Sequence, residues 1–347
     1  MAGTDARAPI GIVGAGALGQ AYAALLARAG DDVVLLASPG SAARLKAAGR
    51  VRLVGAVAAE VPVVAPGGHG GRLGVTDDPS ALAAVAGIVF ATKGHQLPGA
   101  TASVVRAMAS QAGRDWWVAG VQNGLVKDDV LRNAFDPGRL VGAVSILGAG
   151  REDDGTVRIG GLGMTYLGEF DAPPSARVHA AVGRLVGAGI PATAAPDIRS
   201  VLWSKACNAV GIFGVSVLTR LPGPSLWSNP DLVRAFRALI RETDAVARAS
   251  GVAVGDYVGF PIRRYLQMTA TEHVEYAAGL VAGGHANAVI APGAYPSMTQ
   301  DLRAGRAMEV EEVFGDVVAR ADRLGVDVPR IALVCDLLRG VNAAIAG

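Results

Sequence analysis

The chain has 347 residues, of which 51% are hydrophobic and 18% charged, and its formal net charge is +2. That length predicts two domains, and the apolar content is ample for a buried sheet and a helical core. A nearly neutral chain without a long basic run is not expected to bind nucleic acid. The two cysteines, Cys207 and Cys335, exclude a disulfide framework and favour the cytoplasm. The five histidines show no metal-ligand spacing, so no metal is expected.

The first element is a short apolar strand that begins at Ile10 and breaks into the pattern Gly-x-Gly-x-x-Gly. Gly14 lets the chain turn off the strand, Gly16 has no Cβ to block a pyrophosphate, and Gly19 lets the following helix pack closely. Glycine is abundant in this chain, so the pattern alone is weak, and a turn that binds no ligand is the alternative. Its place between a strand and an amphipathic helix favours a dinucleotide site.

Strands and helices alternate through the rest of the first half. Apolar strands are expected at 32–37, 85–91, 116–121, 140–147, 157–159 and 165–169, with helices at 100–110 and 127–133. The Gly/Pro-rich segment 49–79 is expected to form a small hairpin or loop outside the main sheet. Short apolar strands that alternate with helices predict an α/β fold with a parallel, doubly wound sheet.

The pattern changes near Pro196. Helical periodicity without a clear strand covers 197–218, 230–250, 259–282 and 297–346. We therefore predict a Rossmann domain at 1–195 and an all-helical domain at 196–347. The longest apolar stretch, 206–218, contains Asn208 and looks too short to span a bilayer, and the N-terminus does not resemble a signal peptide, so no membrane is expected as a partner.

Two strand ends in the first half are unusually polar. Lys93 and Gln96 follow one strand, and Asn123-Gly124 follows the next. Ligands of open α/β sheets bind at the carboxyl ends of the strands, which favours binding roles for these residues. Asn-Gly is also a common turn dipeptide, so a purely structural role for Asn123 remains an alternative.

A lysine lies within a strongly apolar helical segment in the second half. Lys205 and Asn208 are three residues apart and therefore share one helix face. A helical lysine usually has its ammonium group in solvent, but few polar neighbours mark a solvated face here. A partly buried lysine near a carbonyl group could act as a general acid, with a pKa lowered by desolvation.

The third candidate group runs from Ser297 to Glu309. Ser297 and Gln300 match a capping box, which would give the serine a structural role. One unbroken helix would place Ser297 and Glu309 about 18 Å apart, too far for both to contact one small substrate. Gly305 offers a break, after which Glu309 would lie in the first turn of a new helix and could fold back.

Taken together, these motifs resemble those of the ketopantoate reductase (2-dehydropantoate 2-reductase) family. The resemblance extends from the glycine pattern to about Asn342 and is most specific in the combination of motifs. These motifs are Lys93-x-x-Gln96, Gln122-Asn123-Gly124, Trp203-x-Lys205 and Ser297-Met298-x-Gln300-Asp301-x-Arg303-Ala304-Gly305, followed by Glu309. The resemblance implies a Rossmann domain joined to a helical domain, with NADPH and a 2-oxo acid meeting in the cleft, and a role in pantothenate biosynthesis.

The resemblance also implies roles for individual residues. Lys205 corresponds to the family's catalytic proton donor, and Glu309 corresponds to its acid near the nicotinamide and the substrate. Asn123 and Ser297 match positions that hold cofactor and substrate, and we add Asn208 to the substrate-binding set. The expected cofactor-binding residues are Gly14, Ala15, Gly16, Ala17, Leu18, Gly19, Ser38, Arg44, Lys93, Asn123, Ala149 and Glu309, with Ala149 in a loop of different length.

Three departures from the family pattern are informative. The asparagines that often stand four and eight residues after the lysine are replaced by Ala209 and Phe213, which favours a substrate with a more apolar or bulkier tail than that of ketopantoate. The frequent arginine after the second strand is replaced by Ser38. NADPH is still preferred, because no acidic residue ends that strand and Arg44 can supply charge. Ala307-Met308 replaces a common Pro-Thr and affects local geometry.

The sequence therefore favours a cytoplasmic enzyme that uses NADPH to reduce a small 2-oxo acid, and it leaves a homodimer open. One alternative is another oxidoreductase of the opine or 3-hydroxyacid dehydrogenase type. A second is a non-catalytic sensor that binds NADP, against which the presence of both Lys205 and Glu309 argues.

Overall fold

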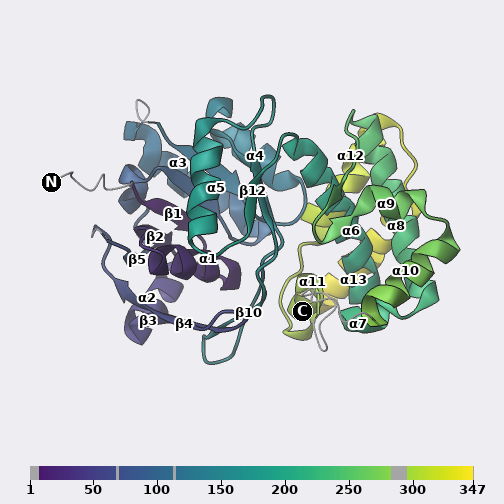
Figure 1. The fold of residues 1–347 in the computed structure, drawn as a ribbon, viewed down its shortest axis with the longest axis horizontal. Coiled ribbons are helices and arrows are strands. Elements are labelled where there is room, and N and C mark those ends of the chain that lie inside the picture. The colour runs from purple at the N-terminus through teal and green to yellow at the C-terminus, as the bar shows by residue number, and fades with distance from the viewer. Residues whose placement is uncertain (1–7, 68–69, 112–114, 283–294, 347) are drawn as a thin grey trace. The chain divides into compact units, whose positions relative to one another are not determined.

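The computed structural model describes residues 8–67, 70–111, 115–282 and 295–346 (Figure 1). The chain divides into two compact units. We call the first the Rossmann unit; it consists of Met1–Gln122 and Lys127–Ile198. The second, the helical unit, consists of Arg199–Gly347 together with the short segment Asn123–Val126.

The Rossmann unit is built on a nine-stranded sheet in the order β7-β6-β1-β2-β5-β4-β3-β10-β9 and a three-stranded sheet in the order β12-β11-β8. The strands are β1 (Ile10–Val13), β2 (Val33–Leu36), β3 (Arg50–Gly55), β4 (Ala59–Val64), β5 (Leu73–Thr76), β6 (Gly87–Phe90), β7 (Trp117–Gly120), β8 (Gly142–Ser145), β9 (Gly148–Arg151), β10 (Val157–Gly161), β11 (Thr165–Gly168) and β12 (Ala192–Ala194). Its α-helices are α1 (Ala17–Arg28), α2 (Pro39–Ala48), α3 (Leu97–Met108), α4 (Val126–Ala134) and α5 (Ala176–Gly187).

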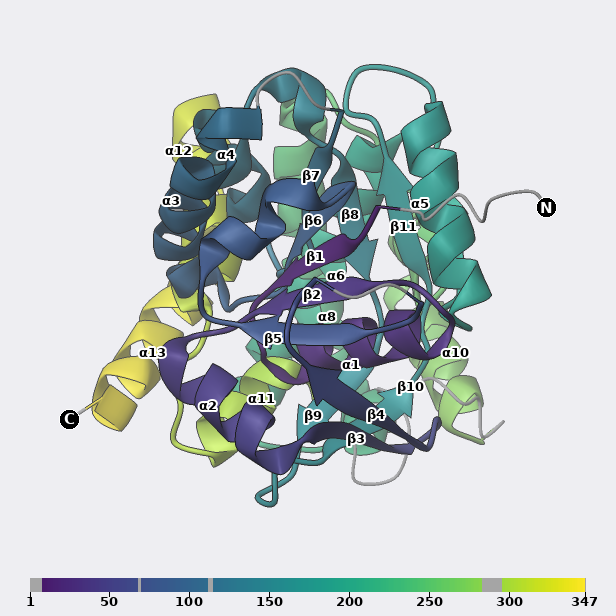
Figure 2. The ribbon, with the colours of Figure 1, turned by 90° about the vertical axis from the view of Figure 1, so that its left-hand side faces the viewer.

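The centre of the large sheet is parallel, as predicted. Strand β1 pairs in parallel with β2 on one side and β6 on the other, and β5 and β7 continue the parallel pairing outward (Figure 2). All four residues of β1 are buried, because helices cover both faces of the sheet. A strand buried on both faces reads as an uninterrupted apolar run, which is why it was recognisable in the sequence.

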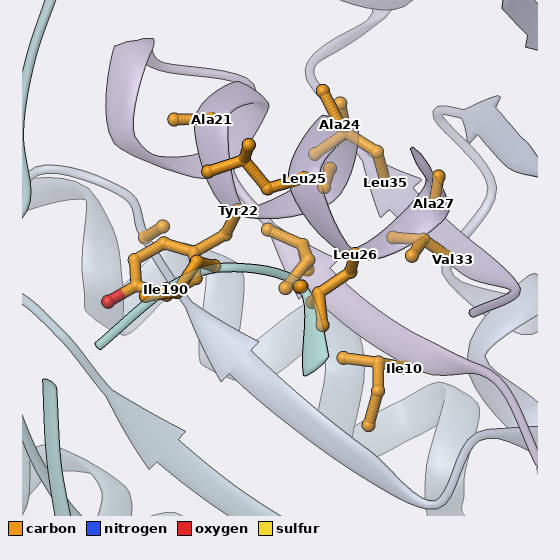
Figure 3. Close-up of a cluster of buried hydrophobic side chains, with 14 of the residues drawn as sticks. Ile10, Ala21, Tyr22, Ala24, Leu25, Leu26, Ala27, Val33, Leu35 and Ile190 are labelled. Atoms are coloured by element: carbon orange, nitrogen blue, oxygen red, sulfur yellow. The ribbon is translucent and has the colours of Figure 1, made fainter. Parts of the chain in front are cut away.

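The two faces carry separate hydrophobic clusters. Helices α1 and α5 pack on one face, where Tyr22, Leu25 and Leu26 of α1 belong to the same cluster as Ile10 of β1 (Figure 3). Helices α3 and α4 supply Val104, Met108 and Leu131 to the cluster on the other face. This arrangement fixes the carboxyl end of β1, and with it the glycine turn.

Two predictions about the sheet are wrong. Segment 49–79 is not outside the main sheet: β3 and β4 form an antiparallel hairpin, and β4 pairs in parallel with β5, which is a buried strand beside β2. The large sheet is also mixed and not purely parallel, since β3 pairs antiparallel with β4 and β9 antiparallel with β10. In the three-stranded sheet, β8 pairs antiparallel with β11. The hairpin itself was predicted. Its place in the main sheet was not, because β5, which joins it to β2, has only four residues and contains a glycine.

The helical unit contains eight α-helices among its described residues: α6 (Ile198–Thr219), α7 (Gly223–Trp227), α8 (Pro230–Ala249), α9 (Ile262–Gln267), α10 (Ala270–Ala282), α11 (Ser297–Arg303), α12 (Asp316–Leu324) and α13 (Pro329–Ala346). A π-helical turn, η5 (Glu311–Gly315), leads into α12. The prediction of no strand is wrong in one detail, because β13 (Asp256–Tyr257) and β14 (Phe260–Pro261) form a two-stranded ribbon.

Helix α6 confirms the helix predicted at 197–218, shifted by one residue at each end. It has 22 residues, and an 18-residue window within it has a mean hydropathy of 1.5, so by length and composition alone it could cross a membrane. However, 83% of that window is buried inside the structure, as in the core helix of a water-soluble protein.

Candidate functional site

The glycine pattern forms the turn between β1 and α1. Gly14 has a φ of 111°, and a Cβ at that position would lie 2.7 Å from the backbone nitrogen of Thr92. A Cβ on Gly19 would overlap the carbonyl oxygen of Gly14. Packing within the protein therefore requires both of these glycines, whether or not a ligand binds.

Gly16 differs from its two neighbours in the pattern. It is exposed, and its φ of −71° is one that any residue adopts. A Cβ there would have Ala91 as its nearest neighbour, at 3.9 Å from the carbonyl oxygen. Packing does not explain a glycine at this position, whereas close approach of a ligand does. Because Gly16 is also the N-cap of the 12-residue helix α1, unpaired N–H groups and a partial positive charge favour an anion here.

The predicted polar strand ends lie next to this turn in the sheet order. Ala91 and Thr92 follow β6, and the Nε2 of Gln122, after β7, donates a hydrogen bond of 3.2 Å to the Thr92 hydroxyl. Half-buried Lys93 caps a short turn, and its backbone N–H donates to the Oε1 of Gln96 at 3.4 Å. The Gln122–Thr92 bond was not predicted, and it ties the ends of β6 and β7 together.

The end of β2 carries no carboxylate. Ser38 is exposed and is the N-cap of α2, but its hydroxyl makes no capping hydrogen bond. Arg44 is exposed on the second turn of α2, and its Nη2 donates to the Ser41 hydroxyl at 2.8 Å. The hydroxyls of Ser38 and Ser41 and the guanidinium of Arg44 therefore all lie on or at the start of α2, the helix that follows β2.

Ala149, the remaining predicted cofactor residue, lies in β9, opposite Ile159 of β10. It is half-buried and packs on the same hydrophobic cluster as Ala17 and Leu18 of α1. The structure therefore gives Ala149 a packing role beside the first turn of α1.

Lys205 lies in the first half of α6 and is half-buried. Burial lowers the pKa of its ammonium group from 10.5 to about 8. Asn208, one helical turn further on, is also half-buried, whereas Ala206, Cys207 and Ala209 are buried. The pair therefore marks the less buried stripe of an apolar helix.

Phe213 has only 4% of its surface exposed. It lies two turns beyond Lys205 on α6, among the buried residues of that helix.

Asn123 belongs to the helical unit although it directly follows a strand of the Rossmann unit. Gly124 has a φ of 79°, and a Cβ on it would overlap the carbonyl oxygen of Glu312 in η5. Asn123-Gly124 therefore forms a turn in the structure, and the absence of a side chain on Gly124 permits close contact with η5. Single π-helical turns occur frequently at functional sites.

The capping-box interpretation of Ser297 is wrong. Helix α11 begins at Ser297 itself, because Pro296, with φ −57° and ψ 151°, is the N-cap. Gln300 does not bond back to Ser297; its Nε2 donates to the carbonyl oxygen of Tyr295 at 2.7 Å. The half-buried Ser297 hydroxyl therefore lies in the first turn of the helix without a capping role.

The predicted break after α11 is confirmed, with Gly305 at a φ of 61°. Glu309 lies one residue before the next helical turn and not inside it, and its carbonyl oxygen accepts from the N–H of Val313 at 3.2 Å. Its side chain is buried, with 3% exposed. Glu309 therefore immediately precedes the helical segment that η5 continues.

Two residues that we did not predict as site residues fix the loop before Glu309. The buried carboxylate of Asp301 accepts from the Nε of Arg306 at 3.0 Å. The Oδ1 of Asn342, on α13, accepts from the N–H of Met308 at 2.8 Å. A polar residue within an apolar helix was the only sequence signal for Asn342.

Several contacts bring the candidate elements of the helical unit together. The Thr299 hydroxyl on α11 donates to the Ser216 hydroxyl on α6 at 2.8 Å. A Cβ on Gly214 of α6 would lie 3.5 Å from the ring of Phe314 in η5. Within the described residues, no three His, Cys, Asp or Glu side chains are grouped in a way that could hold a metal ion.

Two family models match this chain. Residues 10–172 match the model described as ketopantoate reductase PanE/ApbA, and residues 197–342 match the model of its C-terminal domain. A 2-dehydropantoate 2-reductase from Archaeoglobus fulgidus is 28% identical over 96% of this chain and 98% of its own length. Another from Pyrococcus abyssi is 24% identical over 96% of this chain and 97% of its own length.

Solved structures show the same fold. A ketopantoate reductase from Ralstonia eutropha superimposes with a TM-score of 0.76 at 25% identity, covering 98% of this chain and all of the other. A D-mandelate dehydrogenase solved with NADH and anilino(oxo)acetate gives a TM-score of 0.79 at 18% identity, with the same coverage. The family models, the curated relatives and the fold agree along nearly the whole chain. This chain therefore belongs to the ketopantoate reductase family of NAD(P)-dependent oxidoreductases.

Proposed function

We propose that this protein uses NADPH to reduce the carbonyl group of a small 2-oxo acid, 2-dehydropantoate or a related acid, to the 2-hydroxy acid. The observation that carries the proposal is Lys205, an ionisable group half-buried in an apolar helix with a pKa lowered to about 8. Curated relatives that share almost the full length are named 2-dehydropantoate 2-reductase, which supports this substrate class.

Lys205 is the proposed proton donor. When bound, NADPH supplies the hydride that reaches the carbonyl carbon. The ammonium group of Lys205 gives a proton to the carbonyl oxygen, and its charge stabilises the oxyanion as it develops. A pKa near 8 suits this role, because the group is charged at neutral pH and releases its proton far more readily than an exposed lysine.

The other candidates hold the ligands. Glu309 is proposed to act beside the nicotinamide and the substrate, and Asn123 to contact both ligands. Ser297 and Asn208 are proposed to bind the substrate. The helix N-terminus at Gly16 and the side chain of Lys93 are proposed to bind the phosphate groups of the cofactor.

We expect NADPH to bind more tightly than NADH. Ser38 follows the end of β2 and Arg44 lies on the second turn of α2, and no carboxylate is there to repel the 2′-phosphate of NADPH. Calorimetric titration of both cofactors tests this, and equal or tighter binding of NADH would refute the preference.

We place the protein in the cytoplasm, with no nucleic acid or membrane as a partner. Its two cysteines, Cys207 and Cys335, are buried free thiols, and burial raises the pKa of both. Such thiols suit a reducing compartment.

The substrate's tail is expected to be more apolar or bulkier than that of ketopantoate. Phe213 occupies a position where an asparagine could hydrogen-bond a polar substrate group, and an aromatic ring offers apolar area instead. Leaving a substrate hydroxyl unpaired costs about 1–3 kcal/mol. The measurement is kcat/KM for ketopantoate against branched and aryl 2-oxo acids. A preference for ketopantoate of more than about tenfold, some 1.4 kcal/mol, would exclude the apolar-tail proposal but leave the reductase standing.

Lys205→Ala tests the proposed mechanism. The variant should lower kcat by about 100-fold or more, the scale of losing general acid catalysis, and leave NADPH affinity nearly unchanged. In the unmodified enzyme, kcat should fall as the pH rises above about 8, because the acid form of Lys205 is lost. Unaltered turnover by a folded Lys205→Ala protein would give the lysine a structural role only. Glu309→Ala should also lower turnover and raise KM for both ligands.

A further inference from the structure

A buried glutamine contacts the glycine turn from inside the protein. Gln20 is the residue after Gly19, and only 3% of it is exposed. Its Nε2 donates a hydrogen bond of 2.8 Å to the carbonyl oxygen of Ala15. This bond closes the turn across five residues, and it binds the peptide that joins Ala15 to Gly16.

The direction of this bond determines where the N–H of Gly16 points. The described chain contains no cis peptide bond, so the Ala15–Gly16 peptide is trans and planar. In such a peptide the C=O and the N–H point in opposite directions. Gln20 holds the carbonyl oxygen toward the buried side of α1, and the N–H of Gly16 consequently points to the exposed side of the turn. In the described part of the chain, that N–H meets no acceptor.

We propose that Gln20 is a positioning residue for the dinucleotide, which presets the Ala15–Gly16 peptide so that the N–H of Gly16 meets a pyrophosphate oxygen. The inference rests on the cofactor part of the proposed function. A hydrogen bond from an N–H to a phosphate is charge-assisted, and its strength depends on alignment. Without Gln20 the peptide plane can rotate, and cofactor binding must order it at the expense of affinity.

Tyr22, on the same helix, provides a matched control. Its hydroxyl is hydrogen-bonded to Thr165 of β11 at 2.6 Å and to Ser145 of β8 at 2.9 Å, so it fixes α1 to these strands, and neither partner belongs to the turn. Both Gln20 and Tyr22 are buried polar side chains of α1. Removing either donor should lower stability, but only Gln20 should change the affinity for the cofactor.

The first experiment compares Gln20→Met with Tyr22→Phe. Methionine has a similar length but cannot donate a hydrogen bond. The dissociation constant for NADPH, followed by the fluorescence of the bound cofactor, should rise about tenfold in Gln20→Met and stay within twofold in Tyr22→Phe. Adenosine 2′-phosphate, which has no phosphate at the pyrophosphate position, should bind equally well to Gln20→Met and to the unmodified protein.

The second experiment uses Gln20→Glu, which keeps the shape of the side chain and remains informative if Gln20→Met does not fold. A protonated glutamic acid can donate to Ala15, whereas the carboxylate cannot. The affinity of Gln20→Glu for NADP⁺, relative to that of the unmodified protein, should therefore recover as the pH falls.

Any of three results would overturn the inference. These are NADPH affinity in Gln20→Met within twofold of the unmodified protein, an equal loss of affinity for adenosine 2′-phosphate, and affinity of Gln20→Glu that does not recover at low pH. Failure of the unmodified protein to bind any nicotinamide dinucleotide would instead refute the proposed function and the inference together.

Discussion

Gly16→Ala separates the requirements of folding from those of ligand binding. The backbone at Gly16 has a φ of −71°, and the nearest protein atom to a new Cβ lies 3.9 Å away. Alanine is a poorer N-cap than glycine, by about 0.5–1 kcal/mol, but it reduces the entropy of the unfolded chain by about 0.4–1 kcal/mol. These effects offset each other, so the free energy of unfolding should change by less than about 1 kcal/mol.

The same methyl group should be costly when the cofactor is bound. It would occupy the space through which a pyrophosphate reaches the N-terminus of α1. Losing one hydrogen bond to a charged group costs about 1.5–3 kcal/mol, which corresponds to a dissociation constant about 10 to 150 times higher. The expected signature is an almost unchanged melting curve together with a large loss of NADPH affinity.

The assay is NADPH titration by calorimetry, paired with urea unfolding of the same protein. Gly187→Ala is the control, because Gly187 ends α5 with no atom within 4 Å of a new Cβ. It should leave NADPH affinity unchanged and raise the free energy of unfolding by at most about 1 kcal/mol. Unchanged NADPH affinity in Gly16→Ala would show that the ligand does not approach this residue. Strong destabilisation would show that packing, and not a ligand, requires the glycine.

Two further predictions concern the helical unit. Burial lowers the pKa of His273 from 6.5 to about 4, so the unfolded chain binds more protons between these values. Stability should be complete above about pH 6.5 and should fall by about 2 kcal/mol from about pH 7 to about pH 5 in urea unfolding. His273→Phe should lose this pH dependence, and its persistence would exclude His273 as the cause. Gly124→Ala should destabilise the protein more than Gly325→Ala does, and only Gly124→Ala should raise KM. Both glycines have a positive φ, but only a Cβ on Gly124 would meet another atom, the carbonyl oxygen of Glu312. Equal effects of the two variants would contradict this reasoning.

The central strands and the long helices could be predicted from the sequence, because burial on both faces leaves a continuous apolar run in β1 and β2. Strands β5 and β9 could not, because Gly74 lies within one of them and both Gly148 and Gly150 lie within the other. In these strands the neighbouring strands and helices, and not the local sequence, determine the structure.

The residues that we propose to act on the ligands were easier to find in the sequence than the residues that position them. Lys205 stands out in the sequence as a charge within an apolar helix. Glu309 has Arg306, Glu311 and Glu312 close to it in the chain, and only the resemblance to the ketopantoate reductase family singled it out. Gln20 and Asn342 each make one hydrogen bond to a backbone atom. Because every residue has a backbone, the sequence does not show which residue is the partner. Their roles follow only from coordinates.

The three glycines of the fingerprint illustrate what coordinates add to a motif. The sequence does not distinguish the roles of Gly14, Gly16 and Gly19, and a glycine-rich turn that binds no ligand could have the same sequence. In the structure, the chain itself excludes a side chain at Gly14 and Gly19, but it leaves room for one at Gly16. A motif kept only for packing would need two of the three glycines. The third points to a ligand, and it lies at the helix N-terminus, where an anion is best stabilised.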